Sequence, residues 1–373
     1  ACGRRLMERH VLVIGAGQAG LAAGYHLRRA GMAFTIVDAA RRVGDSWRRR
    51  YDGLTLFTPR QFSALPGMEL PGNREGYPDR DEFADYLEAY AVRSNLPILL
   101  EREVVRLIKA DGGFEANFPQ GETLRASDVI VATGAFQRPL VPRVARDFGT
   151  DVLQLTTETF RNPMQVPDGP VLVVGDGASG RDIAVECRST QPVLLATGKP
   201  RRLLPERILG KSIWWWLRLT GVLKAPASSF IGRKLKETDA FPDRGRSNAA
   251  LEQRGIRIVP RLVGAEPGRA RFSDSDTAEI RTVIWATGYR DDTSWLDMAE
   301  AKTADGGFVH AAGISRVKGL YFVGRPWQRN RASALIMGAG EDAALIVQSI
   351  ISTAPSRSSE TGDRTELERP RCP

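Results

Sequence analysis

The most regular feature of the sequence is a set of short, unbroken apolar runs, each ending at a glycine. Residues 11–14 run into Gly15, and residues 171–174 run into Gly175. An apolar run without polar alternation is typical of a strand buried on both faces, as in parallel sheets. In the first region, the pattern predicts a strand over 10–15, a helix over 18–30 and a strand over 33–38. The chain is therefore predicted to be an α/β protein.

Both apolar runs open into the same turn, Gly-x-Gly-x-x-Gly. Its first glycine permits the tight turn, the second lets a pyrophosphate approach the backbone, and the third lets the next helix pack on the strand. The start of that helix offers unpaired N–H groups to the phosphates. One such motif is weak, but two that follow buried strands indicate two bound dinucleotides. The first turn comprises Gly15, Gly17, Gln18, Ala19 and Gly20, and the second comprises Gly175, Asp176, Gly177, Ala178, Ser179 and Gly180.

Each turn has its own later strand that ends in Ala-Thr-Gly. The first such strand comes about 117 residues after Gly15, and the second about 111 residues after Gly175. This spacing indicates an internal repeat and hence two similar Rossmann-like domains. Small residues suit a place where the chain passes close to a cofactor. The two endings are Ala132, Thr133 and Gly134, and Ala286, Thr287 and Gly288.

The second strand of each repeat distinguishes the two nucleotides. Asp38 closes the first of these strands, where a carboxylate binds a ribose hydroxyl and repels a 2′-phosphate, which predicts FAD or NAD. The equivalent position of the second repeat is Thr197, followed by Lys199, Arg201 and Arg202. Cations beside an uncharged residue favour NADPH over NADH. The alternative is a solvated basic loop in an arginine-rich protein.

The repeats predict two domains, with the second inserted in the first. We expect an FAD-binding domain at 10–163 and 290–352, an NADPH-binding domain at 164–289, and disordered tails at 1–9 and 353–373. Within the first domain the sequence also predicts a helix over about 79–95, strands near 98–108 and 114–118, a closing strand over 320–324 and a helix over 334–351.

The segment 205–245 interrupts the alternation of strands and helices in the second domain. It contains Trp214, Trp215 and Trp216, which cannot share one face of a helix. Core packing, the wall or lid of a substrate channel, and contact with a membrane surface are the three interpretations.

Composition agrees with two globular domains. The 373 residues exceed what one core accommodates, and the 42% hydrophobic content is ordinary. The net charge of +9 comes from scattered arginines without a nucleic-acid-binding motif, so we expect no nucleic acid partner. The oligomeric state stays open.

Cysteine and histidine usage excludes several kinds of site. Cys2, Cys187 and Cys372 form no Cys-x-x-Cys pair, which argues against a dithiol redox centre or a disulfide framework and fits a reducing cytoplasm. The three histidines show no ligand spacing, so no metal site is expected. No signal peptide or membrane-spanning segment is expected either.

A more specific block separates the first turn from the second. It contains Trp47, the run Arg50-Tyr51-Asp52, Leu54, Leu56 and Thr58-Pro59, and the second repeat ends in Ala-Thr-Gly-Tyr at 286–289. This order of motifs resembles the flavin-containing monooxygenases over about residues 10–351. The segment from Gly313 to Trp327, with Asp342-Ala343, looks like a bacterial branch of that family.

The resemblance implies a set of chemical roles. NADPH reduces FAD, dioxygen adds to the flavin C4a carbon as a hydroperoxide, and one oxygen atom passes to a small organic substrate. The flavin carries the reaction, and the protein positions it and excludes water. The residues expected beside FAD are Trp47, Arg48, Leu54, Phe57, Thr58, Gly134, Gly324 and Leu335, and Thr287 is expected near the nicotinamide end of NADPH.

One position departs from the family's pattern. Thr156 stands where the linker signature of the family has a histidine, although Phe160 keeps the aromatic residue four positions later. The departure argues against Baeyer–Villiger oxidation and for partly uncoupled turnover. Thr156, Phe57 and Thr58 are the candidate catalytic residues. A peroxide-forming NADPH oxidase or diaphorase and a non-catalytic redox sensor are the alternative functions.

Overall fold

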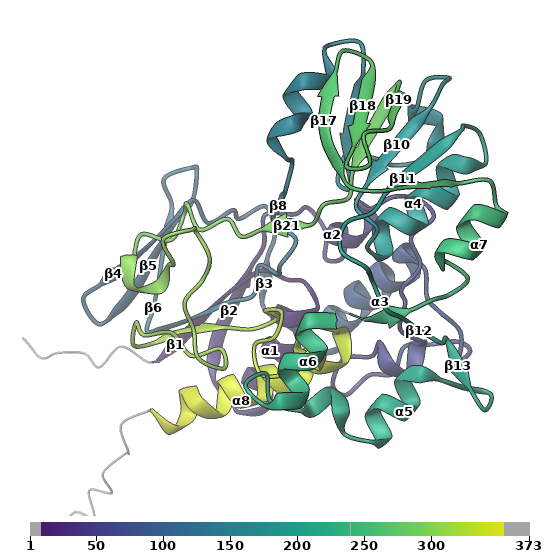
Figure 1. Ribbon diagram of the computed structural model, residues 1–373. Coiled ribbons are helices and arrows are strands. Elements are labelled where there is room, and N and C mark those ends of the chain that lie inside the picture. Colours follow the sequence, from purple (N-terminus) through teal and green to yellow (C-terminus); the bar gives the residue numbers. More distant parts are fainter. Residues whose placement is uncertain (1–8, 239, 354–373) are drawn as a thin grey trace, which may run out of the picture.

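Two five-stranded parallel sheets form the framework of the computed structural model, which describes residues 9–238 and 240–353 (Figure 1). The first sheet has the order β22-β7-β1-β2-β3 and the second the order β16-β11-β10-β20-β9. The first sheet consists of β1 (His10–Ile14), β2 (Ala33–Val37), β3 (Ile98–Leu99), β7 (Asp128–Val131) and β22 (Leu320–Phe322). The second consists of β9 (Leu153–Thr156), β10 (Val171–Val174), β11 (Val193–Ala196), β16 (Arg257–Val259) and β20 (Thr282–Trp285).

The two sheets have the same strand order when one of them is read backwards. In each, the strand before the glycine turn is central, the Ala-Thr-Gly strand lies on one side of it, and the next two strands lie on the other. The strand beyond the Ala-Thr-Gly strand is β22 in the first sheet and β9 in the second. The predicted α/β fold with two dinucleotide-binding units is confirmed.

Each repeat also carries a three-stranded antiparallel sheet immediately before its Ala-Thr-Gly strand. Figure 1 shows these sheets well apart. The sheets are β4 (Arg106–Ala110), β5 (Gly113–Asn117) and β6 (Thr123–Ala126), and β17 (Leu262–Glu266), β18 (Arg269–Phe272) and β19 (Thr277–Glu279). The single strand predicted over 98–108 is wrong. Its start pairs with β2 and its end begins the hairpin, and Glu101 between them has a φ of 55°, which no extended strand contains.

Helices α1, α3 and α8 cover the other face of the first parallel sheet, and α4 and α7 cover that of the second. Asp79 begins α3 with a capping box, close to the start expected for the helix over about 79–95. Helix α1 leads directly out of the first turn, and α4 out of the second. The helices are α1 (Gln18–Arg29), α2 (Asp45–Arg48), α3 (Arg80–Arg93), α4 (Ala178–Arg188), α5 (Ile213–Leu219), α6 (Phe230–Thr238), α7 (Asn248–Gln253) and α8 (Ile336–Ser352).

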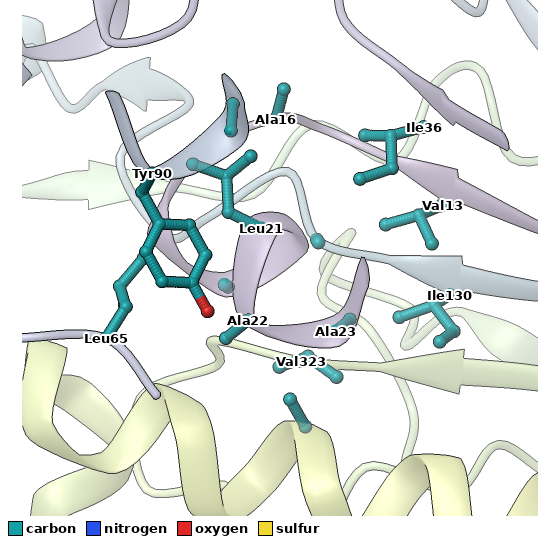
Figure 2. Packing of buried hydrophobic residues seen from close by; sticks show 14 of the residues in the cluster. Val13, Ala16, Leu21, Ala22, Ala23, Ile36, Leu65, Tyr90, Ile130 and Val323 are labelled. Carbon is teal, nitrogen blue, oxygen red and sulfur yellow. The ribbon is translucent and has the colours of Figure 1, made fainter. Parts of the chain in front are cut away.

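The core of the first unit explains why its strands lack polar alternation. Val13 and Ile36 face the helices, packed with Leu21 of α1 and Tyr90 of α3 (Figure 2). The neighbouring residues of the same strands face the three-stranded sheet, where Phe114 packs. Apolar side chains are therefore buried on both faces of the sheet. The second unit repeats this arrangement with its own two core clusters.

Two short strands connect the units. β8 (Arg138–Pro139) leaves the first unit and β21 (Tyr289–Arg290) returns to it, and the two pair antiparallel between the sheets (Figure 1). Strand β9 then joins the second sheet beside β20. The second sheet therefore includes residues that precede the expected domain boundary at 163/164. Its β9 strand lies within residues 10–163, which the sequence assigned to the FAD-binding domain.

The segment that interrupts the second repeat packs against the first unit. Trp214 of α5 is 2% exposed and lies in a cluster with Phe62, Ala332 and Leu335. Its indole Nε1 donates to the carbonyl oxygen of Phe57 at 2.8 Å. Trp214 is a core residue, whereas the two tryptophans that follow are half-buried.

The two ends of the described chain meet at the first sheet. Arg9 Nε lies 2.6 Å from Asp128 Oδ2, and Arg9 Nη2 lies 3.0 Å from Thr353 Oγ1. Both Arg9 and Thr353 were assigned to tails by the sequence. The rest of the two expected tails, including Cys2 and Cys372, lies outside the described residues.

Candidate dinucleotide sites

The two glycine turns have the same backbone geometry. Gly15 has a φ of 107° and Gly175 a φ of 106°. A Cβ on Gly15 would lie 2.6 Å from the carbonyl oxygen of Ala132, and one on Gly175 would lie 2.4 Å from that of Ala286. The Ala-Thr-Gly strand endings thus lie directly behind the turns. This close approach leaves no room for a side chain at Gly15 or Gly175.

The second and third glycines of the turns differ from each other in what surrounds them. A Cβ on Gly20 would lie 1.8 Å from the carbonyl oxygen of Gly15, and one on Gly180 would lie 1.9 Å from that of Gly175. A Cβ on Gly17 or on the equivalent second glycine of the other turn would meet no atom within 4 Å. Packing therefore requires the third glycine, whereas the second is required only if something outside the chain approaches it.

Both turns are suited to an anionic ligand. Gly17 and Gly177 are the N-caps of α1 and α4, and neither helix start has a side-chain cap. The first N–H groups of a helix without a cap are available to phosphate oxygens, and the helix dipole favours the negative charge. The open second glycines and the uncapped helices fit two pyrophosphates.

Asp38 lies at the first turn, as expected. Its Oδ2 accepts the N–H of Ala16 at 2.6 Å and its Oδ1 accepts the N–H of Ala40 at 2.8 Å. These bonds hold the carboxylate at the end of β2, beside the start of the turn. The position matches that of the ribose-binding acid of such domains.

Several residues expected near FAD are brought together around α1. Trp47 Nε1 lies 3.3 Å from Gln18 Oε1, and the Trp47 ring packs edge-on against Phe83. A Cβ on Gly324 would lie 2.6 Å from the Cβ of Ala19. The end of β22 therefore lies against the first turn of α1.

Arg48 is held elsewhere. Its guanidinium contacts Asp45, Asp85 and Glu88, at 3.3, 2.7 and 3.0 Å. Two of these carboxylates belong to α3, which attracts the side chain to that helix. No hydrogen bond or ion pair joins Arg48 to the glycine turn among the described residues, and its expected place beside FAD stays a prediction.

The other candidates from the motif block line the region between the two units. Leu54 packs into the cores of both units. Thr58 is buried, with its Oγ1 2.7 Å from Ser63 Oγ. Phe57 lies against Trp214 and contributes to a small cavity that also contacts Ala178 of the second turn. Leu335, at the start of α8, lies in the same cluster as Trp214.

Two polar residues that the sequence analysis missed bind the end of the first Ala-Thr-Gly strand. Gln137 Nε2 donates to Thr133 Oγ1 at 2.7 Å and to the Gly134 carbonyl oxygen at 2.8 Å. Arg325 Nη1 donates to the same carbonyl oxygen at 2.6 Å and pairs with Asp291. Arg325 is only 7% exposed and directly follows Gly324, and a charged residue beside a site glycine was the signal available in the sequence.

The second turn opens onto a cavity of about 460 Å³. Thr197, Lys199 and Arg201 line it, in agreement with the expected place of a 2′-phosphate. The structure adds residues that the sequence did not single out. These are Arg181, Ser247 and Asn248. Arg202 does not line this cavity.

Residues of the first unit reach across to the second. The Tyr51 hydroxyl bonds to the side chain of Ser179, and burial raises the pKa of the Tyr51 phenol. Arg50 Nη1 lies 2.6 Å from the Tyr289 hydroxyl, which lies 2.7 Å from Thr157 Oγ1. The Arg-Tyr-Asp block and the tyrosine after Ala-Thr-Gly therefore meet at the junction of the units.

Thr156 lies at this junction, but its side chain has a local role. Its Oγ1 accepts the N–H groups of Glu158 and Thr159 at 3.2 and 3.3 Å, and its carbonyl oxygen accepts that of Phe160 at 2.9 Å. Thr156 pairs with Trp285 at the end of β9, next to Ala286. The hydroxyl closes the turn after β9 at the edge of the second Ala-Thr-Gly motif. Thr287 Oγ1 donates to the carbonyl oxygen of Leu140 in the connecting strands.

Other kinds of site find little support in the described part of the chain. Cys187 is buried in α4, and burial raises the pKa of its thiol to about 12, so its reactive thiolate is disfavoured. Residues 9–238 and 240–353 contain no group of three or more His, Cys, Asp or Glu able to hold a metal ion. In the same ranges no helix is long and apolar enough to cross a membrane.

Comparison with known proteins agrees with this geometry. Residues 12–201 match the family described as pyridine nucleotide-disulphide oxidoreductase. A CzcO-like oxidoreductase of Geobacillus kaustophilus is 44% identical, over 91% of this chain and 98% of its own. The indole-3-pyruvate monooxygenase YUCCA4 of rice is 28% identical, over 91% of this chain and 87% of its own.

A solved structure of a flavin-containing monooxygenase is also similar to this chain. The flavin-containing monooxygenase of Stenotrophomonas maltophilia superposes with a TM-score of 0.77 at 26% identity, over 92% of this chain and 99% of that chain. The resemblance to flavin monooxygenases and the cofactor pair predicted from the sequence, FAD and NADPH, are confirmed. The chain is therefore an enzyme of the pyridine nucleotide-disulphide oxidoreductase family, built on the fold of the flavin monooxygenases.

Proposed function

We propose that the protein is an NADPH-dependent flavin monooxygenase that transfers one oxygen atom of dioxygen to a small organic substrate. The observation that carries the proposal is the pair of open second glycines, Gly17 and Gly177, at the starts of two uncapped helices. One chain thus offers two dinucleotide cradles, joined by paired connecting strands. An enzyme that moves electrons from NADPH to a flavin needs this arrangement.

In this proposal the first unit holds FAD and the second holds NADPH. The turn from Gly15 to Gly20 binds the FAD pyrophosphate, and Asp38 binds the adenosine ribose. The turn from Gly175 to Gly180 binds the NADPH pyrophosphate. Lys199 and Arg201 bind the 2′-phosphate in the 460 Å³ cavity.

The chain's own contribution to the reaction is binding, orientation and exclusion of water. A bound flavin, once reduced by NADPH, would activate dioxygen for transfer of one oxygen atom to the substrate. Phe57, Trp214 and Leu335 form an apolar wall between the units that keeps water from this region. Arg50, Tyr289 and Thr157 hold the connecting strands, and so the relative position of the two cofactors.

The test is a stoichiometry experiment on the purified flavin-loaded protein. A panel of a thioether, a tertiary amine, a ketone and indole-3-pyruvate, the compound in the rice relative's name, is supplied with NADPH and dioxygen. We expect oxygenated product from at least one compound, with NADPH consumed faster than NADH. Consumption of NADPH without any oxygenated product from the panel would contradict the monooxygenase proposal.

A second function is supported by Thr156. The family's histidine is replaced by a hydroxyl that closes a turn, which leaves a smaller side chain at the edge of the second nucleotide motif. Easier access of water favours loss of the oxygen as hydrogen peroxide. An NADPH oxidase would reduce dioxygen to nearly one hydrogen peroxide for each NADPH oxidised in the same experiment, with or without the organic compounds.

A further inference from the structure

The cavity beside the second turn contains an acidic residue where an anion is expected to bind. Asp176, the second residue of the turn, is 4% exposed and lines the cavity with Lys199 and Arg201. Its Oδ1 lies 3.2 Å from Arg201 Nε. A carboxylate near a phosphate is repulsive, so its presence requires a reason.

Arg181 is the buried counter-ion of this carboxylate. Arg181 is 3% exposed, its Nη2 lies 3.3 Å from Asp176 Oδ2 and its Nε donates to the Asp176 carbonyl oxygen at 2.9 Å. Its Nη1 donates to the carbonyl oxygen of Arg246 at 2.6 Å. Each nitrogen of this guanidinium has a partner within the chain, so Arg181 is a structural counter-ion of Asp176.

Arg201 is differently placed. It comes from the loop after β11, its side chain is 29% exposed, and Asp176 bonds its Nε. The buried carboxylate thus bonds the Nε of a partly exposed arginine and restricts where its side chain can lie. An arginine on a surface loop otherwise loses side-chain entropy when it binds a ligand, and a fixed partner reduces that loss.

We propose that Asp176 is a positioning residue that holds Arg201 over the cavity and thereby sets the preference for NADPH over NADH. This inference rests on the proposed function, since it assumes that the second unit binds the nicotinamide nucleotide. Asp176 acts through Arg201 and does not touch the phosphate. Its negative charge is compensated by Arg181, so the 2′-phosphate meets an arginine that is already oriented.

The experiment measures equilibrium binding of NADP⁺ and NAD⁺ to the flavin-loaded protein by calorimetry, without turnover. We expect the wild type to bind NADP⁺ more tightly. In Asp176→Asn the Kd for NADP⁺ should rise about tenfold, as for a lost charge-assisted hydrogen bond, and the Kd for NAD⁺ should change less than about twofold. In an Arg201→Ala background, Asp176→Asn should change the Kd for NADP⁺ by less than about twofold, because the two residues act as one unit.

Two further variants keep the test independent of folding. Asp176→Asn leaves Arg181 buried without its partner, so Asp176→Asn combined with Arg181→Gln removes both charges and should show the same loss of preference. Asp297→Asn is the matched control. Its Oδ2 lies 3.0 Å from Arg106 Nε on the surface of the first unit, and its loss should leave both Kd values unchanged.

Other outcomes overturn the inference. Tighter binding of NADP⁺ by Asp176→Asn would show that the carboxylate repels the phosphate. An equal rise in both Kd values would show a merely structural role, and equal wild-type affinities would show that no preference exists. An unchanged preference in Asp176→Asn, in a protein that still forms oxygenated product with NADPH, would refute the inference and leave the proposed function intact.

Discussion

The two glycine turns are almost identical in backbone and differ in charge. The distance from a Cβ placed on the first or the third glycine to the nearest atom differs by about 0.2 Å or less between the two turns. A Cβ on either second glycine would meet no atom within 4 Å. In the first turn, Ala16 follows the first glycine, and the nearby acid, Asp38, belongs to the next strand. In the second turn, the acid is Asp176 within the turn itself, and it is paired with two arginines.

This comparison separates what builds a dinucleotide cradle from what selects its ligand. The cradle is built by sterics, because only glycine fits against the carbonyl oxygens behind the turn. We propose that the ligand is selected at the end of the second strand, where Asp38 stands in one unit and Thr197, with its basic loop, in the other. A fold can therefore be duplicated while its two ligands diverge through a few side chains.

The largest effect is expected at the third glycine. Gly20→Ala or Gly180→Ala places a Cβ within 2 Å of a carbonyl oxygen, and the strand–helix contact cannot relax enough to accept it. Each should lower the free energy of unfolding by roughly 4 kcal/mol or more, or prevent folding. Gly17→Ala adds the same atom in open space and serves as the control. Urea denaturation that ranks Gly17→Ala with Gly20→Ala would contradict the steric account.

The second glycines should separate the two cofactors. Gly17→Val should give a folded protein without FAD, and Gly177→Val should keep FAD and lose binding of NADP⁺, because each isopropyl group fills the space for one pyrophosphate. The flavin absorbance per protein and calorimetry with NADP⁺ measure the two effects. Loss of FAD from Gly177→Val, with the fold intact by circular dichroism, would show that the second turn is needed for FAD binding. It would contradict the assignment of FAD to the first unit alone.

The basic loop should affect only the second ligand. Replacing Lys199, Arg201 and Arg202 with Ala should raise the KM for NADPH roughly 10- to 100-fold, as expected for a loss of about 1.5–3 kcal/mol, and should spare NADH. Content of FAD should be unchanged. Of these three residues, only Arg202 does not line the cavity. Arg202→Ala is therefore the control, and it should raise the KM for NADPH least. Equal KM values of the wild type for NADPH and NADH would contradict the prediction that the basic loop after Thr197 favours NADPH.

A moderate effect is expected at the junction of the units. Thr156→His restores the family's ring beside the second motif and should lower the peroxide formed per NADPH about twofold, because water reaches the site less easily. The ratio is measured with a peroxide assay alongside NADPH absorbance. Thr156→Ser keeps the hydroxyl that closes the turn and should behave as the wild type. A wild type that already forms no peroxide would show that the departure from the family has no catalytic consequence.

The smallest effect concerns the pH dependence of stability at the contact between the units. Burial raises the pKa of Glu186 on α4, which lies against the backbone of Gly53, and Asp52 and Asp182 reinforce the shift. An acid whose folded-state pKa exceeds its unfolded value stabilises the fold most when protonated. Its contribution is present below the unfolded pKa of about 4.3 and is lost as the pH rises through the raised value.

Glu186→Gln should therefore gain stability over the wild type as the pH rises from 4 towards neutrality. Urea midpoints measured across this range test it. Glu115 provides the opposite case, because Asn117 and Arg125 lower its pKa, so Glu115→Gln should lose stability over the wild type as the pH rises. The same slope in both variants would show that Glu186 is not perturbed by its place between the units.

Much of the fold could be predicted because its signals are local. Unbroken apolar runs identified β1 and β10, and glycine spacing identified the turns. Each signal depends on residues within one strand or turn, where periodicity and steric fit act directly. The cofactor pair followed for the same reason, since the residue that distinguishes the nucleotides lies at a known distance from the turn.

The candidate site was less predictable because its side chains choose partners far away in sequence. Arg48 was expected near FAD, but carboxylates of α3 hold it. Arg181 and Arg325 carried no recognisable motif and nevertheless contact the second turn and the first Ala-Thr-Gly strand. Strand β9 could not be distinguished from a linker until it paired with β20, which follows it by more than 120 residues.

The sequence by itself determined that this chain has two dinucleotide-binding units, because glycine sterics act within short segments, and it predicts which nucleotide each unit binds from the residues at the strand ends. Only the tertiary structure decided that Trp214 packs on the opposite unit, that Thr156 closes a turn, and that Asp176 is bonded to Arg181 and Arg201. The contact of Trp214 with Phe57 joins residues 157 positions apart, and the bond of Asp176 to Arg201 joins residues 25 positions apart. The energy of an ion pair or a hydrogen bond depends on that final distance and burial, which no local pattern encodes.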